Sequence, residues 1–322
     1  MAVYTEVASD DLEEFLAQYD IGQLLSYKGI AEGVENSNYL LQTTKGNFIL
    51  TLYEKRVNPD DLPFFLNLME HLAAKGIICP LPLHGKDGNP LRDLCSKKAV
   101  VVTFLSGMGT QRINNQHCGQ LGEALARLHL AGLSFEGRAP SNELSVEGWE
   151  KLFQATQNRA DEVSPGLAQE LEGEINFLKA NWPENLPQGI IHADLFPDNV
   201  FFLGEKLSGL IDFYFACRDF LAYDVAVCLN AWCFDSDFLS FNLTKGKALL
   251  LAYDKIRPFS SQEKEMLPIL ARGAAIRFLL TRLYDLVNTP PGALVKRKDP
   301  MEYLRKQRFH RHITTASGYG LD

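Results

Sequence analysis

Short alternating runs of apolar residues in the first hundred positions indicate strands. Two such runs, residues 38–43 and 47–53, are separated by a three-residue turn that ends at Gly46, which is hairpin length. Between Pro63 and Gly76 the apolar residues recur at helical spacing. Residues 98–105 are almost continuously apolar, which is typical of a buried strand. This part of the chain therefore predicts a small β-rich unit with one prominent helix.

From about residue 114 the pattern becomes mainly helical. Helical periodicity recurs over residues 114–130, 143–153, 167–180 and 262–287. The strongly β-like island of this half lies between Gly189 and Phe213. The flexible stretch Ser106 to Thr110 separates the two kinds of pattern. We therefore expect an α+β protein with an N-terminal lobe, residues 1–105, and a larger helical lobe with a small β-hairpin region, residues 106–322.

Composition narrows the function classes. The net charge is −8 and the basic residues are scattered, so we do not expect nucleic-acid binding; the basic run Lys296 to Lys298 fits a solvated surface loop. The acidic N-terminus lacks a signal-peptide pattern, and no apolar run reaches the ~20 residues of a membrane span. The six cysteines form no CxxC pair. These features predict a cytoplasmic protein with reduced thiols and no membrane partner.

The segment from Gly189 to Tyr214 carries the candidate chemistry. Phosphoryl transfer from ATP requires an acceptor hydroxyl held in line and a metal that neutralises phosphate charge. Protein kinases use a His-x-Asp loop, an Asn five residues after the Asp, and a second Asp on a nearby hairpin. Here His192, Asp194, Asn199 and Asp212 reproduce these spacings. By itself the loop motif could be ordinary turn chemistry; the flanking apolar strands and the hairpin Asp favour catalysis. His192 fits a role in orienting the loop.

The chain resembles the aminoglycoside phosphotransferase and choline kinase superfamily, whose members share the protein-kinase fold. The segments EGVENSNYLL, FILTLYE, HADLFPDNVFF, IDFYFACRDFLAYDVA and LNAWCF are similar to the bacterial homoserine kinases of this fold, and the similarity spans nearly the whole chain. The resemblance implies ATP and Mg²⁺ as cofactors. It also implies Asp194 as the catalytic base and Asn199 and Asp212 as metal ligands.

In the N-terminal lobe the resemblance implies a phosphate-covering loop at residues 32–38, with Ser37 and Asn38 as donors because Gly33 is its single glycine. Glu70 matches the helix Glu that usually pairs with a strand Lys. The strand position expected to hold that Lys is Thr51. Thr103, Phe104 and Leu105 are expected to form the hinge that binds adenine, although a core strand would have the same pattern.

The C-terminal lobe supplies the candidate substrate ligands. Arg277 is a candidate partner for a substrate carboxylate; a buried ion pair with an acid such as Asp224 is the alternative. Trp232 could wall the acceptor pocket or belong to the core. His129 fits a buried hydrogen bond, and Asp224 matches a superfamily Asp expected to anchor the loop. Tyr214 replaces the Gly of the kinase Asp-Phe-Gly motif, which predicts constitutive activity.

The residues predict ATP-dependent phosphorylation of a hydroxyl group. The resemblance implies that this hydroxyl belongs to L-homoserine and that the reaction is a step of threonine biosynthesis. One alternative is a kinase for choline, a sugar or an aminoglycoside. A second alternative is a nucleotide-binding module without activity, since the strand Lys is missing. The sequence leaves the oligomeric state open.

Overall fold

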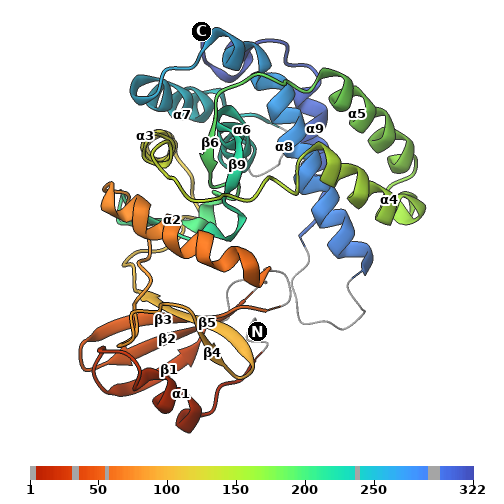
Figure 1. The fold of residues 1–322 in the computed structure, drawn as a ribbon. Helices are drawn as coiled ribbons and strands as arrows, with labels where there is room; N and C mark the ends of the chain where they lie inside the picture. The colour runs from red at the N-terminus through yellow and green to blue at the C-terminus, as the bar shows by residue number, and fades with distance from the viewer. Residues whose placement is uncertain (1–4, 31–35, 55–57, 236–239, 289–297) are drawn as a thin grey trace.

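The computed structural model describes residues 5–30, 36–54, 58–235, 240–288 and 298–322. A small lobe built on a sheet lies against a larger lobe built mostly of helices (Figure 1). The small lobe contains α1 (Ser9–Leu16), β1 (Leu24–Gly29), β2 (Ser37–Thr43), β3 (Gly46–Leu52), α2 (Leu62–Ala74), β4 (Arg92–Leu94) and β5 (Lys97–Thr103). Its five strands pair in the antiparallel order β1-β2-β3-β5-β4. The predicted α+β class, with a small sheet-containing lobe and a larger, mainly helical lobe, is thus confirmed.

The two faces of this sheet have different neighbours. Leu41, Leu50 and Leu52 are fully buried in a core that they share with α1. Val100 and Tyr53 point to the other face and join the large core that includes α2 and the helical lobe. Successive strand residues point to opposite faces. On β3 the side chain of Thr51 therefore faces the large lobe, whereas its neighbours Leu50 and Leu52 face α1.

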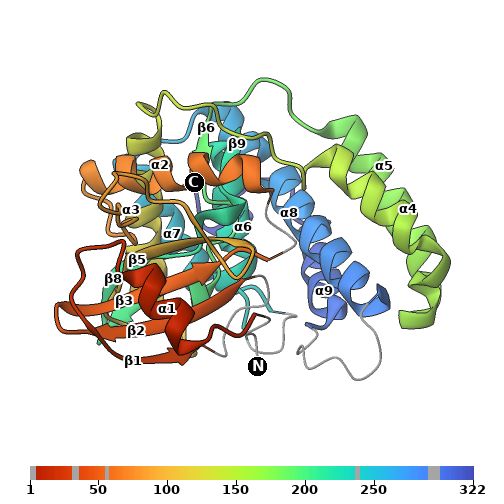
Figure 2. The same ribbon diagram turned by 60° about the horizontal axis from the view of Figure 1, so that its bottom comes forward.

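The large lobe surrounds one fully buried helix. Its helices are α3 (Asn115–Gly132), α4 (Val146–Val163), α5 (Leu167–Asn181), α6 (Leu221–Trp232), α7 (Leu243–Ile256), α8 (Ser261–Asn288) and α9 (Pro300–His310). In α6 every residue except Ala231 is buried, so the helix is enclosed on all sides. Figure 2 shows α4 and α5 as a pair at the edge of the lobe that lies away from the sheet.

Two small β-ladders lie between the helices, and they include the β-like segment predicted between Gly189 and Phe213. Strand β6 (Gln188–Ile191) pairs with β9 (Cys217–Phe220), and β7 (Val200–Leu203) forms a hairpin with β8 (Lys206–Leu210). Short 3₁₀ turns, η2 (Pro197–Asn199) and η3 (Phe213–Phe215), lie directly before β7 and shortly after β8. Further 3₁₀ turns are η1 (Pro59–Asp61) and η4 (Ala316–Tyr319).

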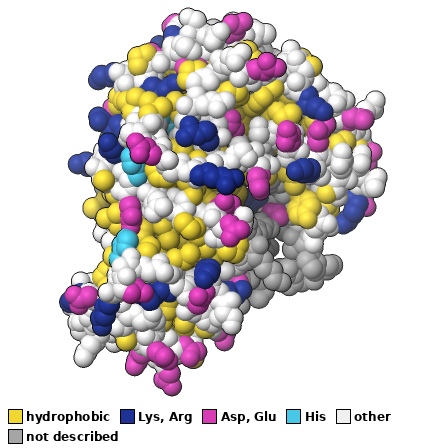
Figure 3. Space-filling view, in the orientation of Figure 1, with side chains coloured by type: hydrophobic (Ala, Val, Ile, Leu, Met, Phe, Trp, Pro, Cys, Tyr) yellow, Lys and Arg dark blue, Asp and Glu magenta, His cyan; other side chains and the backbone are white. Residues whose placement is uncertain are grey.

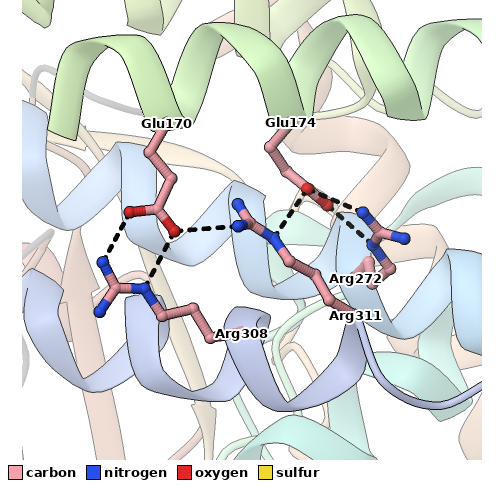
Figure 4. Close-up of polar contacts among 5 residues, drawn as sticks. All are labelled: Glu170, Glu174, Arg272, Arg308 and Arg311. Carbon is pink, nitrogen blue, oxygen red and sulfur yellow. Dashed lines mark hydrogen bonds and ion pairs between the residues drawn. The ribbon is translucent and has the colours of Figure 1, made fainter. Parts of the chain in front are cut away.

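An ion-pair network fastens α5 to the C-terminal helices (Figure 4). Glu174 is almost fully buried and accepts two hydrogen bonds of 2.8 Å from Arg272 on α8. It also accepts one of 3.0 Å from Arg311, just after α9. Glu170, one helical turn earlier, binds Arg308 and Arg311. Because Glu174 and Arg272 are shielded from water, their charges stabilise the fold only as a pair.

Most predicted elements are confirmed, with differences in extent. Helix α4 runs ten residues beyond the predicted end at residue 153, as far as Val163. Helices α6, α7 and α9 were not predicted from periodicity. All six cysteines are free, five of them buried. No helix in the described part of the chain is long and apolar enough to cross a membrane. On the face in Figure 3, acidic and basic side chains are interspersed.

Candidate active site

The predicted catalytic loop runs from the end of β6 to the start of β7, and its backbone is unusual. Ala193 has a φ of 64° and Asp212, at the end of β8, has a φ of 65°. Residues other than glycine rarely adopt this left-handed region, and where they do, surrounding contacts must hold them there. The loop is therefore expected to be fixed by strong hydrogen bonds.

Asp224, fully buried in the first turn of α6, anchors the beginning of the loop. Its carboxylate accepts hydrogen bonds from the backbone N–H groups of His192 at 2.7 Å and Ala193 at 2.8 Å. It also accepts one from Nε2 of His129 on α3 at 3.1 Å. Burial alone would raise the pKa of Asp224, but the hydrogen bonds from His129 and from the backbone of His192 outweigh it and lower the pKa. Asp224 is therefore an ionised anchor, and His129 makes the buried hydrogen bond predicted for it.

His192 orients the loop from within, as predicted. Its Nε2 lies 2.9 Å from the carbonyl oxygen of Ile211, and its Nδ1 lies 3.3 Å from the backbone nitrogen of Asp194. Burial lowers the pKa of this imidazole. A neutral ring that donates from Nε2 and accepts at Nδ1 satisfies both contacts. His192 thus links the strand end before Asp212 to the backbone of Asp194.

Arg277 and Trp232 also support the loop. For Trp232 this agrees with the core position that the sequence left open, whereas Arg277 makes a contact that was not predicted. Arg277 is 1% exposed and donates from Nη1 to the carbonyl of Ala193. In the described part of the chain it has no ion pair, neither with Asp224 nor with another carboxylate. The Nε1 of the fully buried Trp232 donates to the carbonyl of Leu195 at 2.7 Å. Neither side chain reaches an open pocket, because both are packed beneath the loop.

The three residues predicted for chemistry lie together. Asn199 donates from Nδ2 to the carbonyl of Asp194 at 2.8 Å and to its carboxylate at 3.1 Å. The backbone N–H of Ile211 donates to the carbonyl of Asn199 at 2.9 Å, which places Asp212 beside Asn199 across the β7–β8 hairpin. Because its nitrogen faces Asp194, the amide oxygen of Asn199 is available to a cation.

An oxygen-donor pair of this kind fits a hard divalent cation. No group of three or more His, Cys, Asp or Glu side chains in the described residues could hold a metal by itself. Mg²⁺ commonly takes one or two protein oxygens and completes its shell with phosphate and water. The Asn199 and Asp212 oxygens therefore fit a metal that arrives with a nucleotide.

The face of β3 that is turned toward the large lobe carries polar, uncharged side chains at Thr51 and Tyr53. Thr51 donates from its hydroxyl to Oδ1 of Asn38 at 2.7 Å, since the two residues are paired across β2 and β3. Two residues along β3, the hydroxyl of Tyr53 donates to that of Tyr214 at 2.9 Å. Burial raises the pKa of Tyr214 to about 12, and in the described part of the chain Asp212 is the one charged group that contributes to this shift. Here no lysine takes the expected strand position.

Glu70 does not face this cleft. The helix residue that packs on Tyr214 is Phe65, with ring centroids 5.7 Å apart. Five residues later on α2, Glu70 points about 140° away. Its carboxylate is bound to His84. Glu70, which was matched to the helix Glu of the superfamily, therefore pairs with His84 and lies away from the Thr51 position.

Ser37 is likewise turned away from the predicted phosphate side. It is fully buried on the sheet face opposite Asn38, where its hydroxyl donates to Glu54 at 2.7 Å. It also accepts a hydrogen bond from the backbone of Thr5. Residues 31–35 of the predicted phosphate-covering loop lie outside the described residues. Of the two donors predicted there, Asn38 is the one that faces the large lobe.

The predicted hinge connects the lobes as an extended strand end. Thr103 closes β5 and pairs through its backbone N–H with Leu81 at 2.9 Å. In the described structure, the backbone groups of Phe104 and Leu105 have no hydrogen-bond partner within the protein. Phe104 is 40% exposed. Unpaired backbone groups at the edge of a cleft can bind the polar edge of a planar ligand.

Two participants were missed by sequence reasoning. Tyr53 points to the same sheet face as Thr51, so the alternation along β3 could have identified it. Lys298 lies beside the catalytic loop, with its ammonium nitrogen 5.2 Å from the centroid of the Phe196 ring. The sequence signal for Lys298 was the basic run, which was interpreted as a surface loop.

Comparison with known proteins agrees with this geometry. The model of the phosphotransferase enzyme family matches residues 26–259. Homoserine kinases from Paramagnetospirillum magneticum and Bradyrhizobium diazoefficiens are 60% and 62% identical to the chain, of which each alignment covers 100%; the alignments cover 100% and 98% of these relatives.

Solved structures with the same fold include the amicoumacin kinase hAmiN, in a complex with AMP-PNP, Ca²⁺ and amicoumacin. It is 14% identical, with a TM-score of 0.72 over 96% of this chain and 94% of that one. Spectinomycin phosphotransferase is 13% identical, with a TM-score of 0.68 over 98% of each chain. Together with the sequence relatives, these likenesses show that the chain belongs to the phosphotransferase enzyme family and, within it, to the homoserine kinases.

Proposed function

We propose that the protein transfers the γ-phosphoryl group of ATP to the hydroxyl of L-homoserine, giving O-phospho-L-homoserine for threonine biosynthesis. The full-length similarity to homoserine kinases, at about 60% identity, carries the choice of substrate. The grouping of Asp194, Asn199 and Asp212 supports the reaction type, because phosphoryl transfer depends on positioning and charge neutralisation.

Asp194 is the proposed catalytic base. Its carboxylate accepts a hydrogen bond from Asn199, which orients the carboxylate. The hydrogen bonds that fix the catalytic loop limit the movement of Asp194. In this role it receives the hydrogen bond of the acceptor hydroxyl, aligns that oxygen and takes up its proton during transfer. Asn199 and Asp212 would hold Mg²⁺, which when bound supplies positive charge to the phosphate oxygens. The fixed backbone conformation at Ala193 and Asp212 keeps these side chains in constant positions relative to one another.

The nucleotide is proposed to lie between the lobes. The free backbone groups at Phe104 and Leu105, next to Thr103, support adenine binding at the hinge. On the phosphate side, Asn38 can offer its amide N–H₂ group, since its oxygen is occupied by Thr51. We further propose that the enzyme works in the cytoplasm on small molecules alone, without nucleic-acid or membrane partners.

A coupled ADP-release assay tests this function. Wild-type protein with Mg-ATP is offered homoserine, choline, a sugar panel and an aminoglycoside, and Asp194→Asn is measured in parallel. We expect turnover with homoserine and a loss of at least about 100-fold in kcat for the variant. Turnover with another alcohol alone would contradict the substrate. ATP binding without turnover on any acceptor would indicate the nucleotide-binding module instead.

A further inference from the structure

An amino-acid substrate carries a carboxylate that needs a cationic partner near the acceptor site. Arg277, the residue expected to supply this partner, is 1% exposed and donates a hydrogen bond from Nη1 to the carbonyl of Ala193. A buried group that holds the loop cannot also receive a solvated carboxylate from the cleft. If a cation meets the carboxylate, it is therefore another basic residue near the loop.

Two other basic side chains of α8 and α9, among the residues that the structure describes, are already paired. Arg282 donates to the Glu302 carboxylate at 2.6 Å and to the carbonyl of Asp299 at 3.0 Å. Lys306 donates to the other oxygen of Glu302 at 2.6 Å. Both cations are close to fully enclosed, with side chains 10% and 3% exposed. Both side chains are thus engaged by Glu302 inside the fold.

Lys298 differs from these residues in exposure and in pairing. It is exposed, and in the described part of the chain its ammonium group contacts the face of Phe196 without a carboxylate partner. Phe196 belongs to the catalytic loop: its backbone N–H donates to the carbonyl of Asp194 at 2.8 Å. A cation over an aromatic ring is held in place while it keeps its charge for another partner. Lys298 therefore brings an available positive charge to the loop that carries Asp194.

The residues that follow Lys298 fix its position. Asp299 caps α9 by accepting a hydrogen bond from the backbone of Met301 at 2.9 Å, and its own carbonyl is held by Arg282. Pro300 is buried at the first position of the helix. The backbone next to Lys298 is thus anchored to α8 and α9, and its side chain reaches the loop from a rigid base.

We propose that Lys298 binds the α-carboxylate of the amino-acid substrate and so selects amino acids over other alcohols. This inference rests on the proposed function. Three carbon atoms separate the hydroxyl of homoserine from its carboxylate, so a molecule that places its hydroxyl at Asp194 can extend its carboxylate past Phe196 toward Lys298. Lysine suits this role because its flexible side chain can adjust to the position of a small carboxylate ligand.

The test combines a side-chain change with a substrate change. Lys298→Met keeps the stem and removes the charge, Lys298→Arg restores it, and Lys255→Met removes an exposed charge on α7 as a matched control. Each protein is assayed with L-homoserine and with L-homoserine amide, which keeps the acceptor hydroxyl but has no anionic carboxylate. Steady-state kinetics give kcat and KM for the acceptor and for ATP.

We expect Lys298→Met to raise the KM for homoserine about 10- to 100-fold, the loss typical of one charged hydrogen bond. The KM for ATP should stay unchanged, Lys298→Arg should recover most of the loss, and the amide should react equally well with wild type and Lys298→Met. An equal loss with both acceptors, or no loss with homoserine, would overturn the inference and leave the proposed function standing. A wild-type enzyme that does not phosphorylate homoserine would overturn both.

Discussion

The replacement Asp224→Asn tests whether the catalytic loop depends on its buried anchor. The carboxylate receives three hydrogen bonds, from two backbone N–H groups at 2.7 and 2.8 Å and from His129 at 3.1 Å. All three donors point at oxygen atoms. An asparagine has the same shape but only one oxygen, so whichever way it turns, its N–H₂ group meets at least one donor.

The size of the effect follows from burial. Asp224 is fully buried, so water cannot replace a lost hydrogen bond. Hydrogen bonds to a charged group contribute about 1.5–3 kcal/mol each, and a buried donor without a partner costs a further ~1–3 kcal/mol. With one bond lost and the others weakened, we expect a destabilisation of about 3–5 kcal/mol. Because the anchor fixes Ala193 directly before Asp194, we also expect kcat to fall about 100-fold.

The measurement pairs urea unfolding, followed by far-UV circular dichroism, with kcat at saturating homoserine and ATP. Asp254→Asn is the matched control, since Asp254 likewise accepts a hydrogen bond from a backbone N–H, that of Phe259 rather than one in the loop. Its kcat should stay near that of wild type. If Asp224→Asn is folded at the assay temperature and keeps its full kcat, the loop does not need this anchor. Unchanged stability would contradict the energetic reasoning itself.

Two further predictions concern the fold. Glu174→Ala should lower the free energy of unfolding by about 3–5 kcal/mol because it leaves Arg272 buried without its partner. By contrast Glu162→Ala, which breaks an exposed pair with Arg159, should cost less than about 1 kcal/mol; similar losses in urea unfolding would refute this. The second prediction is a pH dependence. Burial lowers the pKa of His310 from 6.5 to about 3 in the folded protein. The unfolded chain therefore binds the proton first, and stability from this group falls as pH drops below 6.5, by about 2 kcal/mol at pH 5. His310→Gln should lack this part of the pH dependence when unfolding is measured from pH 5 to 8, and parallel curves for the two proteins would show that His310 is not responsible.

Local spacing was enough to predict the catalytic loop. His192, Asp194 and Asn199 are close in sequence, and the β-hairpin that brings Asp212 to Asn199 was visible as two apolar runs. Helix periodicity likewise predicted α3, α5 and α8. Helix α6 escaped prediction because it is buried all round and has no polar face to set a period.

The positions of the other site residues depend on the phase of a helix or strand, or on contacts between segments that are distant in the sequence. Glu70 was matched to the helix Glu of the superfamily because it lies on the corresponding helix. The side of α2 that contacts Tyr214, however, is the side that carries Phe65. Ser37 and Asn38 are neighbours that point to opposite faces of the sheet. The roles of Arg277 and Trp232 depend on carbonyl groups of the loop, which no spacing in the sequence reveals. Backbone acceptors leave no residue signature, so such supports are found only from the structure.

Tyr214 occupies the place where protein kinases have the Gly of their mobile segment. Its ring meets Tyr53 and Phe65 edge to face at 5.1 and 5.7 Å, and its hydroxyl bonds to Tyr53 of the other lobe. Swinging this segment away from Asp212 would break two ring contacts and a hydrogen bond, at about 0.5–1.5 kcal/mol each. These contacts favour the position of the segment seen here, and we expect the concentrations of ATP and homoserine, rather than a covalent switch on this segment, to set the rate of the enzyme in the cell.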